Sequence, residues 1–432
     1  MKTSKYNFFR KIYNRGADCW LAYNSFKNSL AVITEDNFAE YKKFEKNNNY
    51  ILTEDLFEKL YDGGYIIEDD VSELELLNFE KEEERFNHSK LTMTIAPTMD
   101  CNFRCAYCYE KNRYENVQMT EEIIEAIIEF VKSKVKNLSL VTVAWYGGEP
   151  LMAINIIQTL SKQLIEVCEK NDIEYEAVIV TNGYLLDEKR AIILKEAKIK
   201  SVQITLDGLE NKHNEKRPLK NGGKTYSRII ENIRNNAPYF DEINIRVNCD
   251  KNNIKDYCKL YQEIKNYNVE NIKMYASPIR DLDCYSCGGC FSRIEFREFE
   301  RNVYKKLGED AYRRFIMDRY PDRGANYCGA QLNNNLIIAA DGSMYKCWAD
   351  VGDAKRSFGN ICDIENIDIC KFIMYNNAVK GEECKICTFY PICAGGCPHE
   401  NAMNKEDVCE YNEKIITDYL TEIIDYKTVS CR

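Results

Sequence analysis

The chain has 432 residues, with 59 Lys and Arg against 69 Asp and Glu, and a formal net charge of -10. This length suffices for about three domains with a sizeable core, so a disordered or fibrous protein is excluded. The acidic balance provides no positive field that would gather nucleic acid or an anionic membrane surface. No apolar stretch approaches the length of a membrane span and no signal-type segment follows Met1, so we expect a cytoplasmic protein without a nucleic-acid or membrane partner.

Cysteine is the most informative residue type, because the chain contains 20 of them. A reducing cytosol and a chain of this size argue against a disulfide framework, so metal or redox chemistry is the better interpretation. The cysteines also group in the sequence, with three in 101–108, three in 284–290 and five in 384–409. Scattered core cysteines would not group in this way.

Residues 1–88 are predicted to form a separate unit with a winged-helix-like outline. A charged helix or linker near its end separates it from the rest of the chain. The apolar pattern predicts two strands, two helices and a third strand, in that order, at 19–23, 29–33, 36–46, 53–62 and 65–67.

From Leu91 onward, predicted strands and helices alternate, which indicates a parallel sheet or barrel with its chemistry at the carboxyl ends of the strands. After about residue 280 the alternation fails, and loops rich in Cys and Gly suggest a region organised by metal. The expected strands are 91–96, 140–145, 175–180, 201–206, 243–247 and 272–276, and the expected helices are 120–135, 154–169, 187–197, 225–236 and 253–266.

Directly after the first of these strands, Cys101, Cys105 and Cys108 form a C-x3-C-x2-C arrangement. Three thiolates on one loop suit a 4Fe-4S cluster, because they leave one iron without a protein ligand and able to bind a substrate or cofactor. Zinc is the alternative, but structural zinc uses four ligands, usually from two separated C-x2-C pairs.

With the aromatic Tyr107 before its third cysteine, this loop resembles that of the radical SAM enzymes, and the resemblance spans about residues 91–280. It implies that S-adenosylmethionine chelates the open iron and that one electron from the cluster releases a 5'-deoxyadenosyl radical. The cofactor then carries the difficult chemistry, while the protein supplies position and excludes water.

Further residues at strand ends agree with this resemblance. Gly147-Gly148-Glu149 resembles the GGE motif of the family, in which glycines allow close approach to the ligand and the carboxylate pairs with the methionine ammonium. Asn182 follows the third strand, and an ordinary turn is the alternative there. The expected cofactor-binding residues are Tyr107, Gly147, Gly148, Glu149, Asn182, Thr205, Asp207, Arg217 and Arg246.

The segment from Thr205 to Arg217 resembles the family pattern S-x-D-G followed by H-D-x-x-R. Thr205 replaces the Ser and Asn214 replaces the second Asp, which puts the role of that carboxylate in doubt. Arg217 and Arg246 each bind the methionine carboxylate or form a surface ion pair. We expect a capping or core function for His213, and no catalytic acid or base can be assigned.

The C-terminal cysteines resemble those of the SPASM domain, which holds two auxiliary 4Fe-4S clusters. By that resemblance the inner cluster is one ligand short. One of Cys284, Cys287 and Cys290 supplies it, or the inner cluster keeps an open iron for a substrate thiolate; a zinc or redox loop is the other interpretation of that triplet. The implied ligands are Cys384, Cys387, Cys393 and Cys409 for the outer cluster and Cys328, Cys347 and Cys397 for the inner one.

The combined resemblance implies three 4Fe-4S clusters, S-adenosylmethionine and a peptide substrate. Our first hypothesis is a maturase that abstracts a hydrogen from a ribosomally made precursor and forms an intramolecular Cys thioether. The first alternative is an anaerobic sulfatase-maturing enzyme. The second alternative is a non-catalytic, zinc-organised binding protein. We expect the precursor's leader to add a strand to the N-terminal unit, and an electron donor of the flavodoxin or ferredoxin type.

The expected fold class is therefore α/β, with a partial (β/α)6 TIM-type barrel between two smaller domains. The expected organisation is a winged-helix-like leader-recognition domain at 1–88, the radical SAM barrel at 89–280, a bridging region at 281–327 and a SPASM domain at 328–432.

Overall fold

The computed structural model describes residues 1–14, 16–108, 110, 117–279, 289–403, 409 and 413–429. The chain divides into two compact units. No helix within these described ranges is long and apolar enough to cross a membrane. The first unit consists of Met1–Phe86, Arg297–Leu332 and Asn376–Arg432, and the second of Asn87–Phe296 and Asn333–Tyr375.

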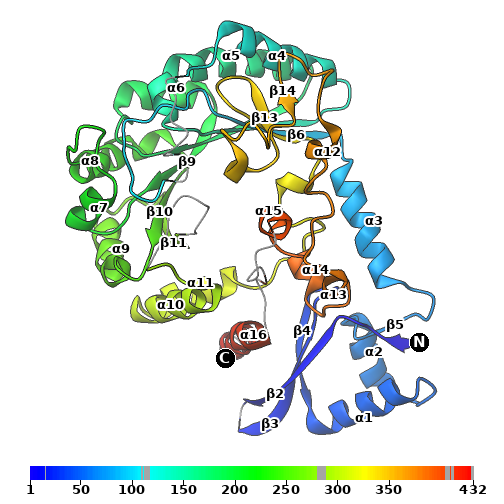
Figure 1. The fold of residues 1–432 in the computed structure, drawn as a ribbon. Helices are drawn as coiled ribbons and strands as arrows, with labels where there is room; N and C mark the ends of the chain where they lie inside the picture. The colour runs from blue at the N-terminus through cyan, green and yellow to red at the C-terminus, as the bar shows by residue number, and fades with distance from the viewer. Residues whose placement is uncertain are drawn as a thin grey trace. The chain divides into compact units, whose positions relative to one another are not determined.

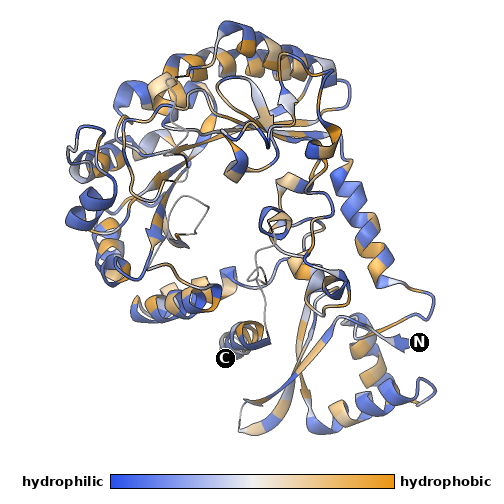
Figure 2. Cartoon of the chain, viewed as in Figure 1, coloured by the Kyte–Doolittle hydropathy of each residue, from blue (hydrophilic) through white to orange (hydrophobic). Residues whose placement is uncertain are grey.

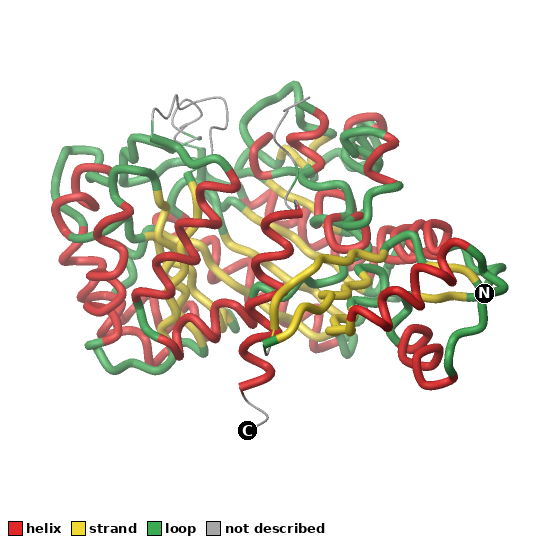
Figure 3. The backbone as a smooth tube through the Cα atoms, turned by 90° about the horizontal axis from the view of Figure 1, so that it is seen from below, coloured by secondary structure: helices red, strands yellow, loops and turns green. Residues whose placement is uncertain are grey.

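The second unit is built on a nine-stranded sheet whose strand order is β11-β10-β9-β8-β7-β6-β12-β13-β14. Strands β6 to β11 run parallel, and the helices that connect them lie outside the sheet (Figures 1 and 3). The expected α/β fold with a six-stranded core is thus confirmed. The strands are β6 (Lys90–Ile95), β7 (Leu140–Trp145), β8 (Glu174–Thr181), β9 (Ile199–Thr205), β10 (Glu242–Cys249) and β11 (Ile272–Pro278).

The helices of this unit close the βα repeats at nearly the predicted positions. Some of their N-termini carry side-chain caps; the Thr120 hydroxyl, for example, accepts the Ile123 N–H at 3.4 Å at the start of α4. The helices are α4 (Glu121–Lys134), α5 (Ile154–Lys170), α6 (Glu188–Glu196), α7 (Glu210–Lys216), α8 (Tyr226–Asn236), α9 (Tyr257–Lys265) and α12 (Ile369–Phe372), with short 3-10 turns at Pro150–Ala153, Ala237–Tyr239, Ile254–Asp256 and Trp348–Asp350.

Three short strands that the sequence analysis did not predict extend the sheet past β6. They are β12 (Asn335–Ile338), β13 (Ser343–Tyr345) and β14 (Gly359–Asn360). β12 runs parallel to β6, whereas β13 and β14 are antiparallel to their neighbours. Part of the Cys-rich C-terminal region therefore belongs to the barrel sheet. Apolar residues of this part pack against the start of the first cysteine loop.

The first unit contains an antiparallel sheet of order β2-β3-β4. The expected third strand at 65–67 does not join it: β5 (Ile66–Ile67) pairs with β1 (Lys2–Thr3) in a separate ladder. The third strand of the sheet is β2 (Asn7–Asn14), where Arg10 and Lys11 interrupt the apolar pattern. The other elements are β3 (Ala17–Asn24), β4 (Ser29–Thr34), α1 (Glu35–Lys46), α2 (Glu54–Asp62) and α3 (Glu73–Arg85).

The N-terminal sheet is buried on both faces by helices of the same unit. One face packs on α1 and α2, and the other packs on α11 and α16, where Leu21 and Tyr23 share a core with Ile416 and Leu420. Figure 2 shows apolar residues on these strands and helices. Residues 1–86 thus depend on the C-terminal helix for part of their core. The remaining helices are α10 (Arg293–Lys306), α11 (Glu309–Asp318), α13 (Glu382–Lys385), α14 (Tyr390–Cys393), α15 (Pro398–Ala402) and α16 (Glu413–Val429), with a 3-10 turn at Gly329–Gln331.

Candidate active site

The first cysteine loop follows β6, at the carboxyl edge of the parallel sheet. Its backbone is hydrogen-bonded to the last residue of α7 and to the segment that follows that helix. The Arg104 N–H donates to the Pro218 carbonyl at 2.9 Å, and the Ala106 N–H donates to the Lys216 carbonyl at 3.1 Å. These two backbone hydrogen bonds fix the course of a loop that has no helix or strand of its own.

The three thiols of this loop lie close enough to affect one another. The pKa of Cys105 is raised to about 11, mainly by burial; Arg217 opposes this rise and the neighbouring Cys108 contributes to it. Burial likewise raises the pKa of Cys101, with smaller contributions from Glu149 and the other two thiols. Thiolates gathered in a buried loop require a cation, and a 4Fe-4S cluster supplies it, so the donor set fits this cofactor.

Gly147 and Gly148 pack directly on the backbone of the cysteine loop. A Cβ on Gly148 would lie 2.2 Å from the Asp100 carbonyl oxygen, and one on Gly147, whose φ is +112°, would lie 2.5 Å from that of Thr98. The Gly148 N–H also donates to the Thr98 carbonyl at 3.2 Å. The glycines therefore allow two loops to approach each other, and any other residue would displace the cysteine loop.

Glu149 is completely buried, and both of its carboxylate oxygens accept hydrogen bonds. One oxygen accepts the Leu151 N–H at 3.0 Å and the Thr181 hydroxyl at 2.6 Å, and the other accepts the Asn182 N–H at 2.8 Å. Burial raises the pKa of this carboxyl, although the three hydrogen bonds oppose the shift. The expected pairing of Glu149 with the methionine ammonium stays a prediction, and the contacts to Thr181 and Asn182 link the ends of β7 and β8.

Tyr107, Asp207 and Arg217 form one hydrogen-bonded group. The Tyr107 hydroxyl donates to Asp207 and accepts from Arg217 at 2.6 Å, and the Arg217 guanidinium lies 3.9 Å from the Asp207 carboxylate. Asn248, which the sequence analysis missed, donates to the Tyr107 hydroxyl at 3.0 Å. Its position two residues after Arg246 on β10 is the signal that would have found it, since alternate strand residues share a face.

Two buried donors near the cysteine loop have no hydrogen-bond partner among the described residues: Arg217 Nε and Asn102 Nδ2. The Asn102 side chain also accepts from the side chain of Asn182 at 2.7 Å, which links the predicted residue Asn182 to the cysteine loop. Unsatisfied buried donors are costly unless a ligand pairs with them. Each donor can pair with an acceptor such as a carboxylate, so the chemistry of these residues fits the methionine end of S-adenosylmethionine.

The remaining predicted cofactor residues lie side by side on β9 and β10. Thr205 pairs in register with Arg246, and Arg246 Nε donates to the Asn248 side chain at 2.9 Å. Thr205 is buried at the carboxyl end of β9. The structure thus brings the residues expected on different strands to one edge of the sheet.

Asn214, which departs from the family pattern, and its neighbour His213, which matches it, both have clear surroundings. Asn214 accepts the N–H groups of Thr225 and Tyr226 at 2.8 and 3.0 Å, at the start of α8, so its amide oxygen fulfils a capping function. His213 is fully buried, and burial lowers its pKa well below the ordinary value. Its Nδ1 accepts the Asp207 N–H at 3.2 Å, which agrees with a core function.

The C-terminal cysteines fall into both units. Desolvation raises the pKa of Cys387, and Cys384 and Cys409 raise it further, so these three thiols lie near one another. Cys384 and Cys393 both raise the pKa of Tyr390. The four cysteines expected for the outer cluster therefore share one neighbourhood in the first unit.

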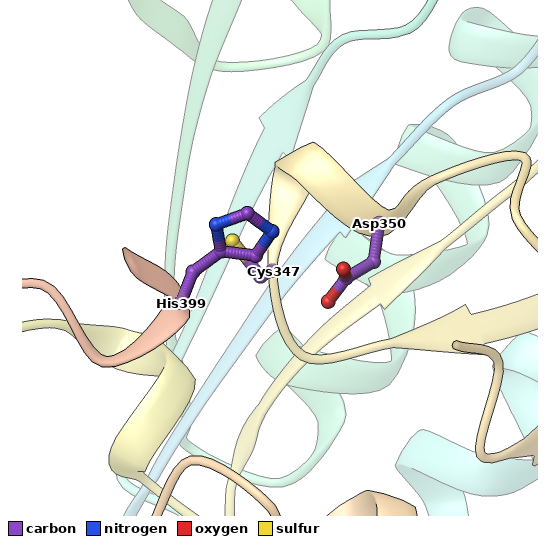
Figure 4. Close-up of side chains that lie close together, drawn as sticks. All are labelled: Cys347, Asp350 and His399. Carbon is purple, nitrogen blue, oxygen red and sulfur yellow. The ribbon is translucent and has the colours of Figure 1, made fainter. Parts of the chain in front are cut away.

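The cysteines expected for the inner cluster stay a prediction. Cys328 and Cys397 belong to the first unit and Cys347 to the second. Cys347 and Asp350 lie on one turn, where the Asp350 N–H donates to the Cys347 carbonyl at 3.1 Å (Figure 4). The buried Asp350 carboxylate accepts the Tyr375 hydroxyl at 2.6 Å, which holds that turn.

The Cys284, Cys287 and Cys290 triplet is only partly described. Cys284 and Cys287 lie outside the described residues. Cys290 takes part in a disulfide bond. Which of the three completes a cluster stays a prediction.

A profile of the radical SAM superfamily matches residues 95–246, which include the cysteine loop and β7 to β9. This stretch is a radical SAM domain. A curated relative, the cysteine-type anaerobic sulfatase-maturating enzyme of Clostridium perfringens (strain 13 / Type A), is 26% identical over 336 residues, or 71% of this chain and 88% of that enzyme. The GTP 3',8-cyclase of Helicobacter pylori is 31% identical over 143 residues, or 32% of this chain and 42% of that enzyme.

Two solved structures are similar in fold to this chain. The structure of anSMEcpe with bound AdoMet and the Cp18Cys peptide has a TM-score of 0.61 at 22% identity, covering 79% of this chain and 98% of that one. Streptococcus suis SuiB bound to the precursor peptide SuiA has a TM-score of 0.54 at 16% identity, covering 95% and 98%. Both likenesses extend beyond the matched radical SAM stretch, since they cover 79% and 95% of this chain.

Proposed function

We propose that this radical SAM enzyme modifies a ribosomally made precursor peptide, abstracting a hydrogen and joining the resulting carbon to a cysteine sulfur. The observation that carries the proposal is the N-terminal part of the fold. The likeness to peptide-bound SuiB covers 95% of this chain, and the part left out is smaller than Met1–Phe86. Most of that N-terminal region therefore has a counterpart in a protein whose structure holds a precursor peptide.

Cys101, Cys105 and Cys108 are the residues that would hold the catalytic cluster. That cluster, with S-adenosylmethionine, supplies the 5'-deoxyadenosyl radical that removes the hydrogen atom. Arg217 Nε and Asn102 Nδ2 are the unsatisfied donors that would bind the methionine carboxylate. The close packing of Gly147 and Gly148 on the cysteine loop would hold these groups in place and exclude water.

Forming the thioether removes two hydrogen atoms from the peptide. One leaves as a hydrogen atom and becomes part of 5'-deoxyadenosine; the other leaves as the thiol proton and an electron, which requires an acceptor. The cysteine sets of the C-terminal region are suited to hold such an acceptor. We propose two auxiliary 4Fe-4S clusters there, and a flavodoxin- or ferredoxin-type donor for the first electron.

The leader of the precursor is proposed to bind along β4. Among the strands that the structure describes, it pairs with β3 alone, and it ends the N-terminal sheet. The opposite edge strand, β2, lies beside α16, with Arg10 bonded to Glu413 at 2.6 Å. Edge strands recognise extended peptides through main-chain hydrogen bonds, and Val32 on β4 exposes 43% of its surface for a side-chain contact.

An anaerobic sulfatase-maturing activity is the second candidate. It is supported by the 26% identity to the Clostridium perfringens enzyme over 71% of this chain. Such an enzyme oxidises a Cys or Ser side chain to formylglycine and does not join two residues. The gene neighbourhood discriminates: a short Cys-rich reading frame favours crosslinking, and a sulfatase gene favours formylglycine.

The test uses the full chain, purified and reconstituted without oxygen, with S-adenosylmethionine, a reductant and the Cys-containing peptide. We expect 5'-deoxyadenosine and a peptide that has lost two hydrogens and no longer reacts with a thiol-alkylating reagent. A product that reacts with a hydrazine probe indicates formylglycine instead. Stoichiometric zinc without iron-sulfur absorbance, and no deoxyadenosine, would support the non-catalytic binding protein and refute the proposal.

A further inference from the structure

The hydroxyl of Tyr107 is the centre of a network that joins the cysteine loop to two strands. It donates to Asp207, which follows β9, and it accepts from Arg217 at 2.6 Å and from Asn248 at 3.0 Å. Tyr107 directly precedes Cys108, and the Cys108 N–H donates to the Cys105 carbonyl at 3.2 Å. Whatever holds the Tyr107 ring thus also limits the positions open to these two thiols.

Asn248 forms hydrogen bonds in this network through both its side chain and its backbone. Its amide nitrogen donates to Tyr107, its amide oxygen accepts from Arg246 at 2.9 Å, and its backbone N–H donates to Asp207 at 3.2 Å. Its backbone carbonyl accepts from Asn253 at 2.8 Å, which also donates to the Asp207 carbonyl at 3.2 Å. The side chain of Asn248 is therefore held at both of its polar ends.

We propose that Asn248 is a positioning residue for cofactor binding, which acts by holding the Tyr107 hydroxyl and the Arg246 guanidinium in fixed relation to the cysteine loop. The amide orders both partners at once, because its donor faces the loop and its acceptor faces the neighbouring arginine. The proposal rests on the cluster and S-adenosylmethionine proposed for this site. It does not depend on which peptide product forms.

The test compares Asn248→Ser with Asn244→Ser on the same strand. Asn244 lies four residues earlier, where its amide donates to Ser201 at 3.3 Å and to Glu242, far along β10 from the cysteine loop. Both variants of the reconstituted full chain are titrated with S-adenosylmethionine while the electron paramagnetic resonance signal of the reduced cluster is followed. We expect about tenfold weaker binding for Asn248→Ser, as for the loss of one buried hydrogen-bonded pair, and no change for Asn244→Ser.

A double-mutant cycle with Tyr107→Phe separates positioning from a general loss of packing. If Asn248 acts through the Tyr107 hydroxyl, Asn248→Ser weakens cofactor binding by less than threefold in the Tyr107→Phe background. Additive effects of the two substitutions on the dissociation constant would overturn the proposal. So would equal binding by Asn248→Ser and Asn244→Ser. All measurements omit the peptide, so failure of the thioether proposal leaves this result unaffected.

Discussion

Glu149 and Asn182 lie at the ends of neighbouring strands, and the Glu149 carboxylate accepts the Asn182 backbone N–H at 2.8 Å. The same carboxylate also binds the Thr181 hydroxyl and the Leu151 N–H. Because these groups are buried, each would lose a partner if the carboxylate were removed. The GGE segment thus has a structural function in addition to the cofactor-binding one that we propose.

Replacing Glu149 by Gln should lower the free energy of unfolding by about 1 to 2 kcal/mol, because an amide NH2 group then faces a backbone N–H. Chemical denaturation of the full chain without cofactor measures this change. Glu166→Gln, on the exposed side of α5, is the matched control and should differ from the original protein by less than about 0.5 kcal/mol. Equal stability of the two variants would contradict the link between β7 and β8.

The difference in stability between the original protein and Glu149→Gln should depend on pH. Burial raises the pKa of Glu149 in the folded state above its value in the unfolded state. The folded protein then holds this proton more tightly, so the contribution of Glu149 to stability is fully present below the ordinary glutamate pKa and declines as pH rises toward the raised value. The difference in stability between the original protein and Glu149→Gln should therefore shrink as pH rises through that window. A constant difference would show that the pKa is not raised.

Replacing Cys101, Cys105 and Cys108 together by Ala should reduce deoxyadenosine formation below detection. Iron content should fall by the amount of one 4Fe-4S cluster and leave the C-terminal iron in place. Cys168→Ala is the control, since Cys168 is buried among apolar residues of α5 and has no ligand spacing. Cofactor cleavage by the triple variant would refute the assignment of the catalytic cluster.

Asn214 should tolerate Asp but not Ala. Asp keeps an oxygen that accepts the N–H groups of Thr225 and Tyr226, and its charge is favourable at the N-terminus of α8. Ala leaves both groups without that acceptor, and we expect a loss of about 1 to 2 kcal/mol, measured by denaturant titration. If Asn214→Asp impaired cofactor binding while Asn214→Ala did not, the capping interpretation would be incorrect.

The leader-binding proposal is tested on β4 by substitution and not by truncation. Removing residues 1–88 would expose the core that Leu21 and Tyr23 share with α16, so the remaining chain would not report on recognition alone. Val32→Arg should weaken the binding of a fluorescent leader peptide about tenfold and leave deoxyadenosine formation without peptide unchanged. Ile192→Arg on α6 is the control, because Ile192 is 42% exposed and Val32 is 43% exposed. Equal leader affinity in both variants would exclude β4 as the binding edge.

The alternation of apolar segments was enough to predict the barrel, because each strand and helix of that part carries its own periodic pattern. The cysteine spacing likewise predicted the loop that follows β6, since a ligand set on one loop is a local feature of the chain. Strands β12 to β14 were missed because two to four residues contain no measurable period, and they become strands only by pairing with β6 and with one another.

The same distinction applies to the site. The sequence alone was enough to propose candidate residues at the strand ends, because composition and spacing are properties of the chain. Only the tertiary structure decided their contacts: Glu149 faces Asn182 across two strands, and Asn248 meets Tyr107 from a position 141 residues away. Such contacts depend on register and loop path, which are set by packing between distant segments and leave no local pattern.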